Sequence, residues 1–289
     1  MPRNVLSLVV ALGATVVGLP LLWFGGATAV GALDVTGDGI SAAAIGPALL
    51  AVLGGAVLAV AGYSIRWSSL GALVTGALHL AVSLLALVFA PYDEGALPPL
   101  WQLVFDLDRT APELSSGIAM TLAFGVSALV GVSLLVGGLA GLRLHAATAL
   151  RRWLALLGGL IAIVMVVWAL ASGLRVYVGF LVTASPDAAV IGPQVVQLAL
   201  LVVAFGVTLL PLRWSSLGAW TAGIVVTALG LLLLAPLPEI LAALPSDIAF
   251  LIATAGPAGL LTAVGLTVIG VALGSGRRRR DALAASEVG

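Results

Sequence analysis

Two basic residues inside long apolar runs are the best candidates for chemistry in this sequence. His79 lies ten residues after Ser69, where an apolar run begins, which puts it about 15 Å along a helix that rises 1.5 Å per residue. An ionisable residue at that depth in a membrane is a candidate to bind a proton, an ion or a ligand. A structural role is the alternative, because a neutral imidazole can share a hydrogen bond with a hydroxyl of the next helix.

Arg175 is the second candidate. It follows the apolar run 154–174 and precedes Val-Tyr-Val-Gly-Phe-Leu-Val, so we expect it in the outer leaflet. Snorkelling of the guanidinium to the lipid headgroups is the favoured interpretation. Pairing with Asp34, Asp187 or an anionic ligand is the alternative.

Residues for catalysis or metal binding are otherwise scarce. The chain has two histidines and no cysteine, and it lacks a Walker loop, a Gly-x-Ser-x-Gly elbow and an HExxH helix. No predicted span carries an acidic residue in its middle, which argues against a carboxylate relay for protons or sodium. We therefore predict no catalytic residue, no metal site and no cofactor, and no segment suits nucleic acid.

Composition shows which solvent surrounds the chain. Hydrophobic residues make up 62% of the 289 positions and charged residues 8%, and the mean hydropathy is +1.24. Soluble domains carry roughly 25% charged residues, so lipid must surround most of this chain. The chain has no lysine, so its twelve permanently charged basic residues are all arginine. Ala, Gly and Val are abundant, and both features are typical of a GC-rich bacterial genome. The expected location is the bacterial cytoplasmic membrane, with membrane lipid as a partner.

Long apolar runs predict an all-α, polytopic membrane helix bundle. A helix needs about 20 apolar residues to cross a bilayer, and eight runs qualify: 5–29, 45–65, 69–90, 116–142, 154–174, 190–212, 216–235 and 249–273. A secretory signal is the alternative for the first run, because Ala27 and Ala29 form a cleavage-like pair. That run exceeds the roughly 7–15 apolar residues of a signal, so we interpret it as a retained helix.

Charges are sorted along the chain. Ten of the twelve arginines fall at the termini or in even-numbered loops, and ten of the twelve acidic residues fall in odd-numbered loops. Because positive charge stays on the cytoplasmic side, both termini are predicted to be cytoplasmic. An even number of spans agrees with that orientation.

The sequence also repeats itself, which indicates two copies of one four-helix unit. The heptapeptide Arg-Trp-Ser-Ser-Leu-Gly-Ala at 66–72 recurs letter for letter at 213–219. We assign the first repeat to 1–147, the second to 148–276, and a basic cytoplasmic tail to 277–289. Units with an even number of helices insert the same way up, so the repeats should be parallel.

The repeated motif has a structural interpretation. Arginine anchors the cytoplasmic face, tryptophan lies in the aromatic belt, and the serines can cap the next helix; these residues are Arg66, Trp67, Ser68, Ser69, Arg213, Trp214, Ser215 and Ser216. Small residues four apart follow in each copy and favour close helix packing; they are Ala72, Gly76, Ala219 and Gly223. We expect each of the two helices that carry them to lie against a neighbour, and the two helices packing against each other is one such arrangement.

Three connecting segments complete the prediction. Residues 98–107 and 238–244 each begin with proline and continue as a short apolar stretch, typical of a helix in the outer interface. Such a stub either covers the bundle or gates it for lipid or substrate. Arg277 to Arg280 is interpreted as a stop-transfer anchor that can also attract anionic lipid, and the residues beyond it are expected to be disordered.

Function is the weakest part of the prediction. The sequence favours a membrane protein without enzymatic activity, transporter-like or permease-like. One alternative is a scaffold or assembly subunit that binds another membrane protein. An intramembrane lipid-modifying enzyme is a further alternative, disfavoured because two histidines and scattered outer carboxylates make a poor catalytic set.

Topology can be tested by single-cysteine labelling, since the natural chain has no cysteine. A cysteine at Asp106 should react with an impermeant maleimide in intact cells, and one at Ala147 should react only after permeabilisation. The reverse pattern would overturn the predicted orientation.

Overall fold

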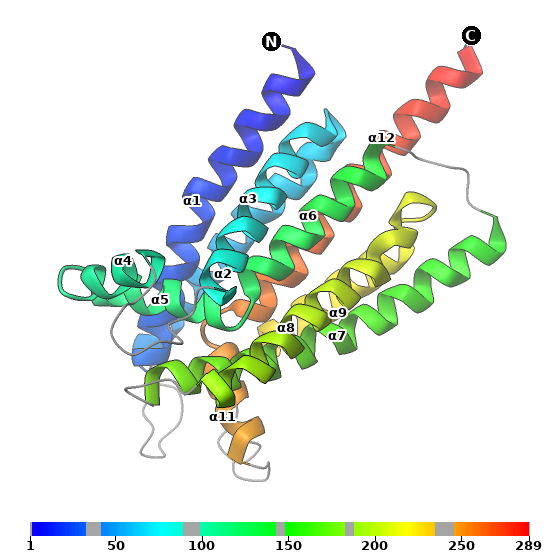
Figure 1. Cartoon of the computed structure of the whole chain (residues 1–289). Helices are drawn as coiled ribbons and strands as arrows, with labels where there is room; N and C mark the ends of the chain where they lie inside the picture. The colour runs from blue at the N-terminus through cyan, green and yellow to red at the C-terminus, as the bar shows by residue number, and fades with distance from the viewer. Residues whose placement is uncertain are drawn as a thin grey trace.

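A computed structural model describes residues 2–32, 42–88, 99–142, 148–182, 188–234 and 246–288. These residues form helices and contain no strand. The longer helices form a bundle (Figure 1), and the elements are α1 (Arg3–Gly31), α2 (Ala42–Tyr63), η1 (Ser64–Arg66), α3 (Ser69–Val88), α4 (Pro99–Asp108), α5 (Pro112–Ala123), α6 (Val126–Leu142), α7 (Ala149–Val182), α8 (Ala188–Leu209), η2 (Leu210–Arg213), α9 (Leu217–Leu232), α11 (Ser246–Ala255) and α12 (Leu260–Val288).

The predicted all-α class is confirmed, and the helices are compatible with a multi-pass membrane protein, whereas the count of eight spans is not confirmed. Within the described residues, six helices are long and apolar enough to cross a membrane: α1, α2, α3, α7, α8 and α12. The helices α5 and α6 make a seventh span if the bent pair is counted as one. The run predicted at 216–235 is the apolar helix α9, which has only 16 residues.

Two glycines break helices that hydropathy predicted to be continuous. Gly125 lies between α5 and α6, which are bent by 59°, and Gly259 precedes α12. Their φ angles of 71° and 67° lie in the left-handed region, which glycine adopts without steric cost. A glycine in this conformation commonly ends a helix. Hydropathy averages over these positions, which is why the predicted spans 116–142 and 249–273 missed the breaks.

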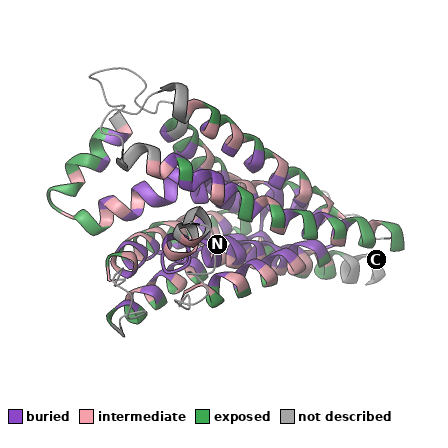
Figure 2. Ribbon diagram, turned by 90° about the horizontal axis from the view of Figure 1, so that it is seen from below, coloured by how far each residue is buried: buried purple, intermediate pink, exposed green. Residues whose placement is uncertain are grey.

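Exposure along the bundle is that of a protein surrounded by lipid. Val16, Leu200 and Leu232 are 70%, 65% and 72% exposed, although each is strongly apolar. Buried residues follow the faces where helices meet, as the purple stripes in Figure 2 show. Since lipid tails are as apolar as leucine, contact between these helices must come from close packing and hydrogen bonds rather than from the hydrophobic effect.

Glycines provide that close packing between α2 and α12. A Cβ atom added to Gly55 would lie 2.8 Å from the Cα of Ala263, and one added to Gly62 would lie 2.7 Å from the nitrogen of Val271. A Cβ at Gly270 would overlap the carbonyl oxygen of Ala59. The two backbones therefore touch over several turns, which only glycine permits.

The arginines at the end of α12 are part of the folded structure. The helix continues to Val288, so the expected disorder of the tail is wrong. Arg278 donates to the hydroxyl of Ser69 at 2.8 Å, and Arg279 donates to the carbonyl of Leu212 at 2.9 Å. These hydrogen bonds join α12 to the start of α3 and to η2, and they give the arginines a role beyond anchoring.

The tight glycine contacts predict that two glycine-to-alanine substitutions will change the stability of the protein by very different amounts. Gly270→Ala should lower the free energy of unfolding by about 1–3 kcal/mol, because its methyl group meets backbone that cannot move aside. Gly13→Ala is the matched control, since nothing lies within 4 Å of an added Cβ there. Thermal unfolding of the purified protein in detergent should show a clear loss for the first variant only. Equal melting temperatures would contradict the described α2–α12 contact.

Candidate functional site

His79 lies inside the bundle and forms a polar pair. Its side chain is 4% exposed in α3, and its Nδ1 atom is 3.0 Å from the hydroxyl of Ser127 in α6. The hydroxyl of Ser83 donates to the backbone carbonyl of His79 at 2.8 Å. The Nε2 atom of His79 is buried and has no hydrogen-bond partner among the described residues. The pair therefore leaves one imidazole nitrogen free.

Facing glycines make room for this histidine. A Cβ at Gly131 of α6 would lie 2.9 Å from the Cβ of His79, and one at Gly76 would lie 2.7 Å from the carbonyl oxygen of Gly131. In the second half, Gly223 of α9 faces Gly265 of α12 in the same way. The expectation that α3 and α9 pack against each other is therefore wrong at these glycines, because α6 and α12 bring their own glycines to the contact. Ala72 and Ala219 are buried.

The repeated Arg-Trp-Ser-Ser residues form the turns before α3 and α9. The hydroxyls of Ser68 and Ser215 each accept a hydrogen bond of 3.2 Å, from the backbone nitrogens of Leu70 and Leu217 respectively. Aromatic and cationic contacts accompany both turns. In the first turn, Arg66 donates to the Tyr63 hydroxyl, and the Trp67 and Tyr63 rings meet edge to face. In the second turn, Arg213 lies 4.4 Å from the centre of the Trp214 ring. Ser69 binds Arg278, and Ser216 is half-buried.

Arg175 is exposed on α7, near the end of the helix. The acidic partners considered for it, Asp34 and Asp187, lie outside the described residues. Its neighbour Tyr177 lines a cavity and is the more informative residue of this segment.

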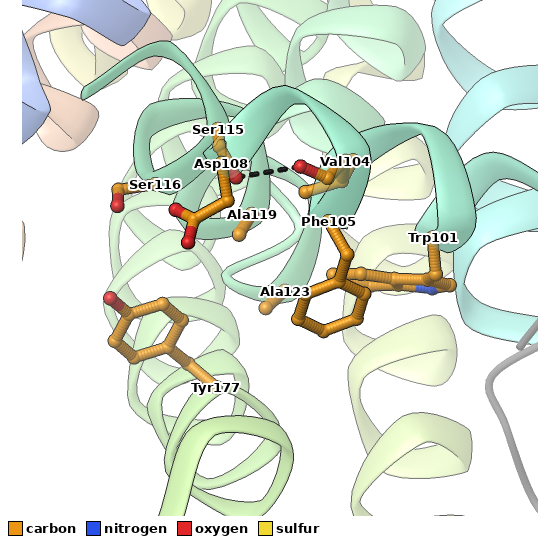
Figure 3. A pocket seen from close by; sticks show the side chains of 9 residues that line it. All are labelled: Trp101, Val104, Phe105, Asp108, Ser115, Ser116, Ala119, Ala123 and Tyr177. Atoms are coloured by element: carbon orange, nitrogen blue, oxygen red, sulfur yellow. Dashed lines mark hydrogen bonds between the residues drawn. The ribbon is translucent and has the colours of Figure 1, made fainter. Parts of the chain in front are cut away.

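A cavity of about 140 Å³ lies between α4, α5 and α7. The residues around it are drawn in Figure 3, and they are Trp101, Val104, Phe105, Asp108, Ser115, Ser116, Ala119, Ala123 and Tyr177. Three aromatic rings and one carboxylate stand among small side chains. The cavity combines residues of the first half with Tyr177 of the second half.

Hydrogen bonds hold α4 in position over this cavity. Trp101, which is 3% exposed, donates its indole N–H to the carbonyl of Ala86 at 2.9 Å. The hydroxyl of Ser115 donates to the carbonyl of Val104 at 2.8 Å. The Tyr177 ring packs on Phe124, with ring centres 5.3 Å apart, beside the break at Gly125. The walls of the cavity are thus fixed by neighbouring elements.

Sequence reasoning located the cover of the cavity but not its chemistry. Residues 99–107 of the predicted stretch belong to the helix α4, as the proline start and composition suggested, while 98 and 238–244 lie outside the described residues. Trp101, Phe105 and Asp108 are spaced by four and three residues, which puts them on one helical face. That spacing was the one feature of the sequence from which this part of the lining could have been predicted. Tyr177 could not be found in this way, because it comes from a distant helix.

The lining has side chains that are suited to bind a ligand. Among the described residues no group of three metal-binding side chains occurs, and the single carboxylate of the cavity has no nearby histidine or second acid in its lining. Aromatic faces and a carboxylate are suited to hold a cation or the polar end of an amphiphile.

Comparison with known proteins assigns no family to the chain. No family model, no curated protein and no solved structure matches it. The site must therefore be interpreted from its own geometry.

Replacing His79 by valine tests whether the buried pair is needed for folding. The residue of the second half that aligns with His79 is Val226, so a valine side chain is accommodated at that position there. His79→Val loses one neutral hydrogen bond, worth about 1 kcal/mol, but also removes a buried nitrogen that lacks a partner. We expect the melting temperature in detergent to change little. A drop as large as that of Gly270→Ala would show that the histidine supports the fold directly.

Proposed function

We propose that this chain is a multi-pass protein of the bacterial cytoplasmic membrane, transporter-like and without enzymatic activity, that binds the polar end of an amphiphile near its outer face. The observation that carries the proposal is the cavity under α4. Its lining comes from both halves of the chain, and aromatic rings and a carboxylate converge there. Binding sites of membrane transporters commonly lie where two repeats meet.

Two parallel four-helix repeats are part of the proposal. A pair of close contacts supports them. The second contact is the same as the first, except that the two halves of the chain have changed roles. A Cβ at Gly26 of the first half would meet Ala258 beside the break before α12, and one at Gly173 of the second half would meet Phe124 beside the break before α6. The residues 124 and 258 each precede a left-handed glycine. Reciprocal contacts of this kind are what a two-fold relation between the halves produces.

The orientation in the membrane follows from charge and from the positions of the termini. Both termini lie at the same end of the bundle in Figure 1, and α4 and α5 lie toward the opposite end. Arg278 and Arg279, near the C-terminus, bind Ser69 and Leu212, so the arginine-bearing turns before α3 and α9 lie beside the tail arginines. The positive-inside rule makes the end with the termini the cytoplasmic end, so the cavity opens near the outer leaflet.

A non-catalytic scaffold or assembly subunit is the second candidate. The backbone contacts between α2 and α12 favour it, because they hold the two halves rigidly against each other. A rigid bundle can present a surface to another membrane protein without moving. Binding of a ligand in the cavity would separate the first candidate from this one.

Filling the cavity tests the proposed function. Ala119 lines the cavity and is 8% exposed, so Ala119→Leu places a larger side chain in its volume. Native mass spectrometry of the protein extracted from membranes should show a bound amphiphile with the natural chain and little or none with this variant. Thr110→Leu is the control, since it adds an apolar side chain to an exposed position outside the lining.

Two outcomes would contradict the proposal. One is the absence of any co-purified amphiphile from the natural chain together with no binding of added lipid. The other is equal retention by the Ala119→Leu variant, which would place the bound molecule elsewhere. Thermal unfolding of both variants shows whether a loss of binding reflects a loss of folding.

A further inference from the structure

We infer that the cavity recognises an ammonium group, carried either by a lipid headgroup or by a free amine. This inference rests on the proposed function and specifies the chemical class of its ligand. It is drawn from three features of the lining: fixed aromatic rings, one carboxylate, and a volume that admits only a small group.

The aromatic rings surround the cavity from two different parts of the chain. Trp101 and Phe105 belong to α4, with ring centres 6.4 Å apart, and Tyr177 belongs to α7. A cation within about 6 Å of an aromatic face is attracted by the ring quadrupole, and cages of several rings are a known means of binding quaternary ammonium. Because the Trp101 indole and the Tyr177 ring are held by Ala86 and Phe124, the cage is formed before the ligand arrives.

Asp108 supplies the opposite charge. Among the described residues of the lining it is the only charged one. It is exposed, and Figure 3 shows its side chain among the labelled residues around the cavity. Asp106, two residues earlier on the same helix, is also exposed but does not line the cavity. A negative group beside aromatic faces selects a cation over a neutral group of the same shape.

Two arginines near the cavity bear on this selection. Arg109 follows Asp108 and is exposed, and Arg175 is exposed two residues before Tyr177. Positions two apart on a helix are separated by roughly 200°, so Arg175 lies on the far side of α7 from Tyr177. Neither arginine belongs to the lining. Neither therefore places a positive charge in the wall of the cavity, where it would repel an ammonium group.

The volume limits the size of the ligand. Pockets for drug-sized molecules measure roughly 300–1,000 Å³, whereas this cavity measures about 140 Å³. A methylated or primary ammonium group with one or two further carbons fits such a space, and an acyl chain must stay outside in the lipid. The cavity therefore matches the end of a molecule rather than a whole amphiphile.

Radiolabelled choline is the probe that tests the inference. The full chain is placed in nanodiscs of phosphatidylglycerol, which has no ammonium group, and binding is measured by scintillation proximity. Tetramethylammonium should displace choline, and dimethylbutanol, the uncharged carbon isostere of choline, should do so at least about tenfold more weakly. Asp108→Asn should weaken choline binding about tenfold, while Asp106→Asn, the matched control on α4, should leave it unchanged.

The source of the ammonium group is resolved by changing the lipid. If a headgroup is the natural ligand, adding phosphatidylcholine or phosphatidylethanolamine to the nanodiscs should displace choline, and unchanged choline binding identifies a free amine instead. Phe105→Leu should weaken choline binding several-fold in either case, because it removes one ring of the cage.

Three results would overturn the inference. Equal competition by dimethylbutanol would show an apolar pocket that ignores charge, which leaves the proposed amphiphile binding intact. Equal effects of Asp108→Asn and Asp106→Asn would move the site away from the cavity. No choline binding at all, together with an amphiphile that co-purifies with the natural chain and is lost in Ala119→Leu, would show a ligand without an ammonium group.

Discussion

Direct contact between helix backbones is the constraint on which this structure depends. Lipid gives apolar helices no reason to associate, so the bundle is held where glycine lets backbones meet and where carbonyls accept hydrogen bonds. Gly55, Gly62 and Gly270 provide such contacts between α2 and α12, and Gly76 and Gly131 provide them between α3 and α6. The choice of partner for each helix follows from where these glycines lie, and not from the length or hydropathy of the helix.

Two helix contacts that are built alike on facing glycines bury different polar groups. The facing glycines of α3 and α6 have counterparts in α9 and α12, yet the first pair holds His79 and Ser127 while the second pair buries the hydroxyls of Thr227 and Thr262. The cavity depends on α4, whose residues lie in the first half of the chain. The two glycine contacts share their packing but not their polar groups, so a specific function is to be sought in those polar groups and not in the packing itself.

Hydropathy predicted the helical class and most of the long helices, for reasons that the coordinates make plain. A lipid-facing helix must be apolar over most of its length, so its presence is visible in composition. The breaks at Gly125 and Gly259 were not visible, because one left-handed residue hardly changes an average over twenty. The tail beyond the arginines was misjudged as disordered, because α12 continues to Val288. The hydrogen bonds of Arg278 and Arg279 were not foreseen, since their partners Ser69 and Leu212 are far away in sequence. The cavity was missed because Tyr177 joins it only through tertiary packing.

Close packing of the core and ligand binding at one end are compatible because they use different parts of the chain. The cavity lies under α4, beside the break at Gly125, while the α2–α12 contact uses glycines of other helices. Ala123 lines the cavity, and the next residue, Phe124, packs on Tyr177. An occupant of the cavity therefore touches the residues that border the bend between α5 and α6. That bend is itself closely packed, because a Cβ at Gly173 of α7 would overlap the Cα of Phe124, so the same kind of backbone contact that holds the core also fixes the floor of the cavity.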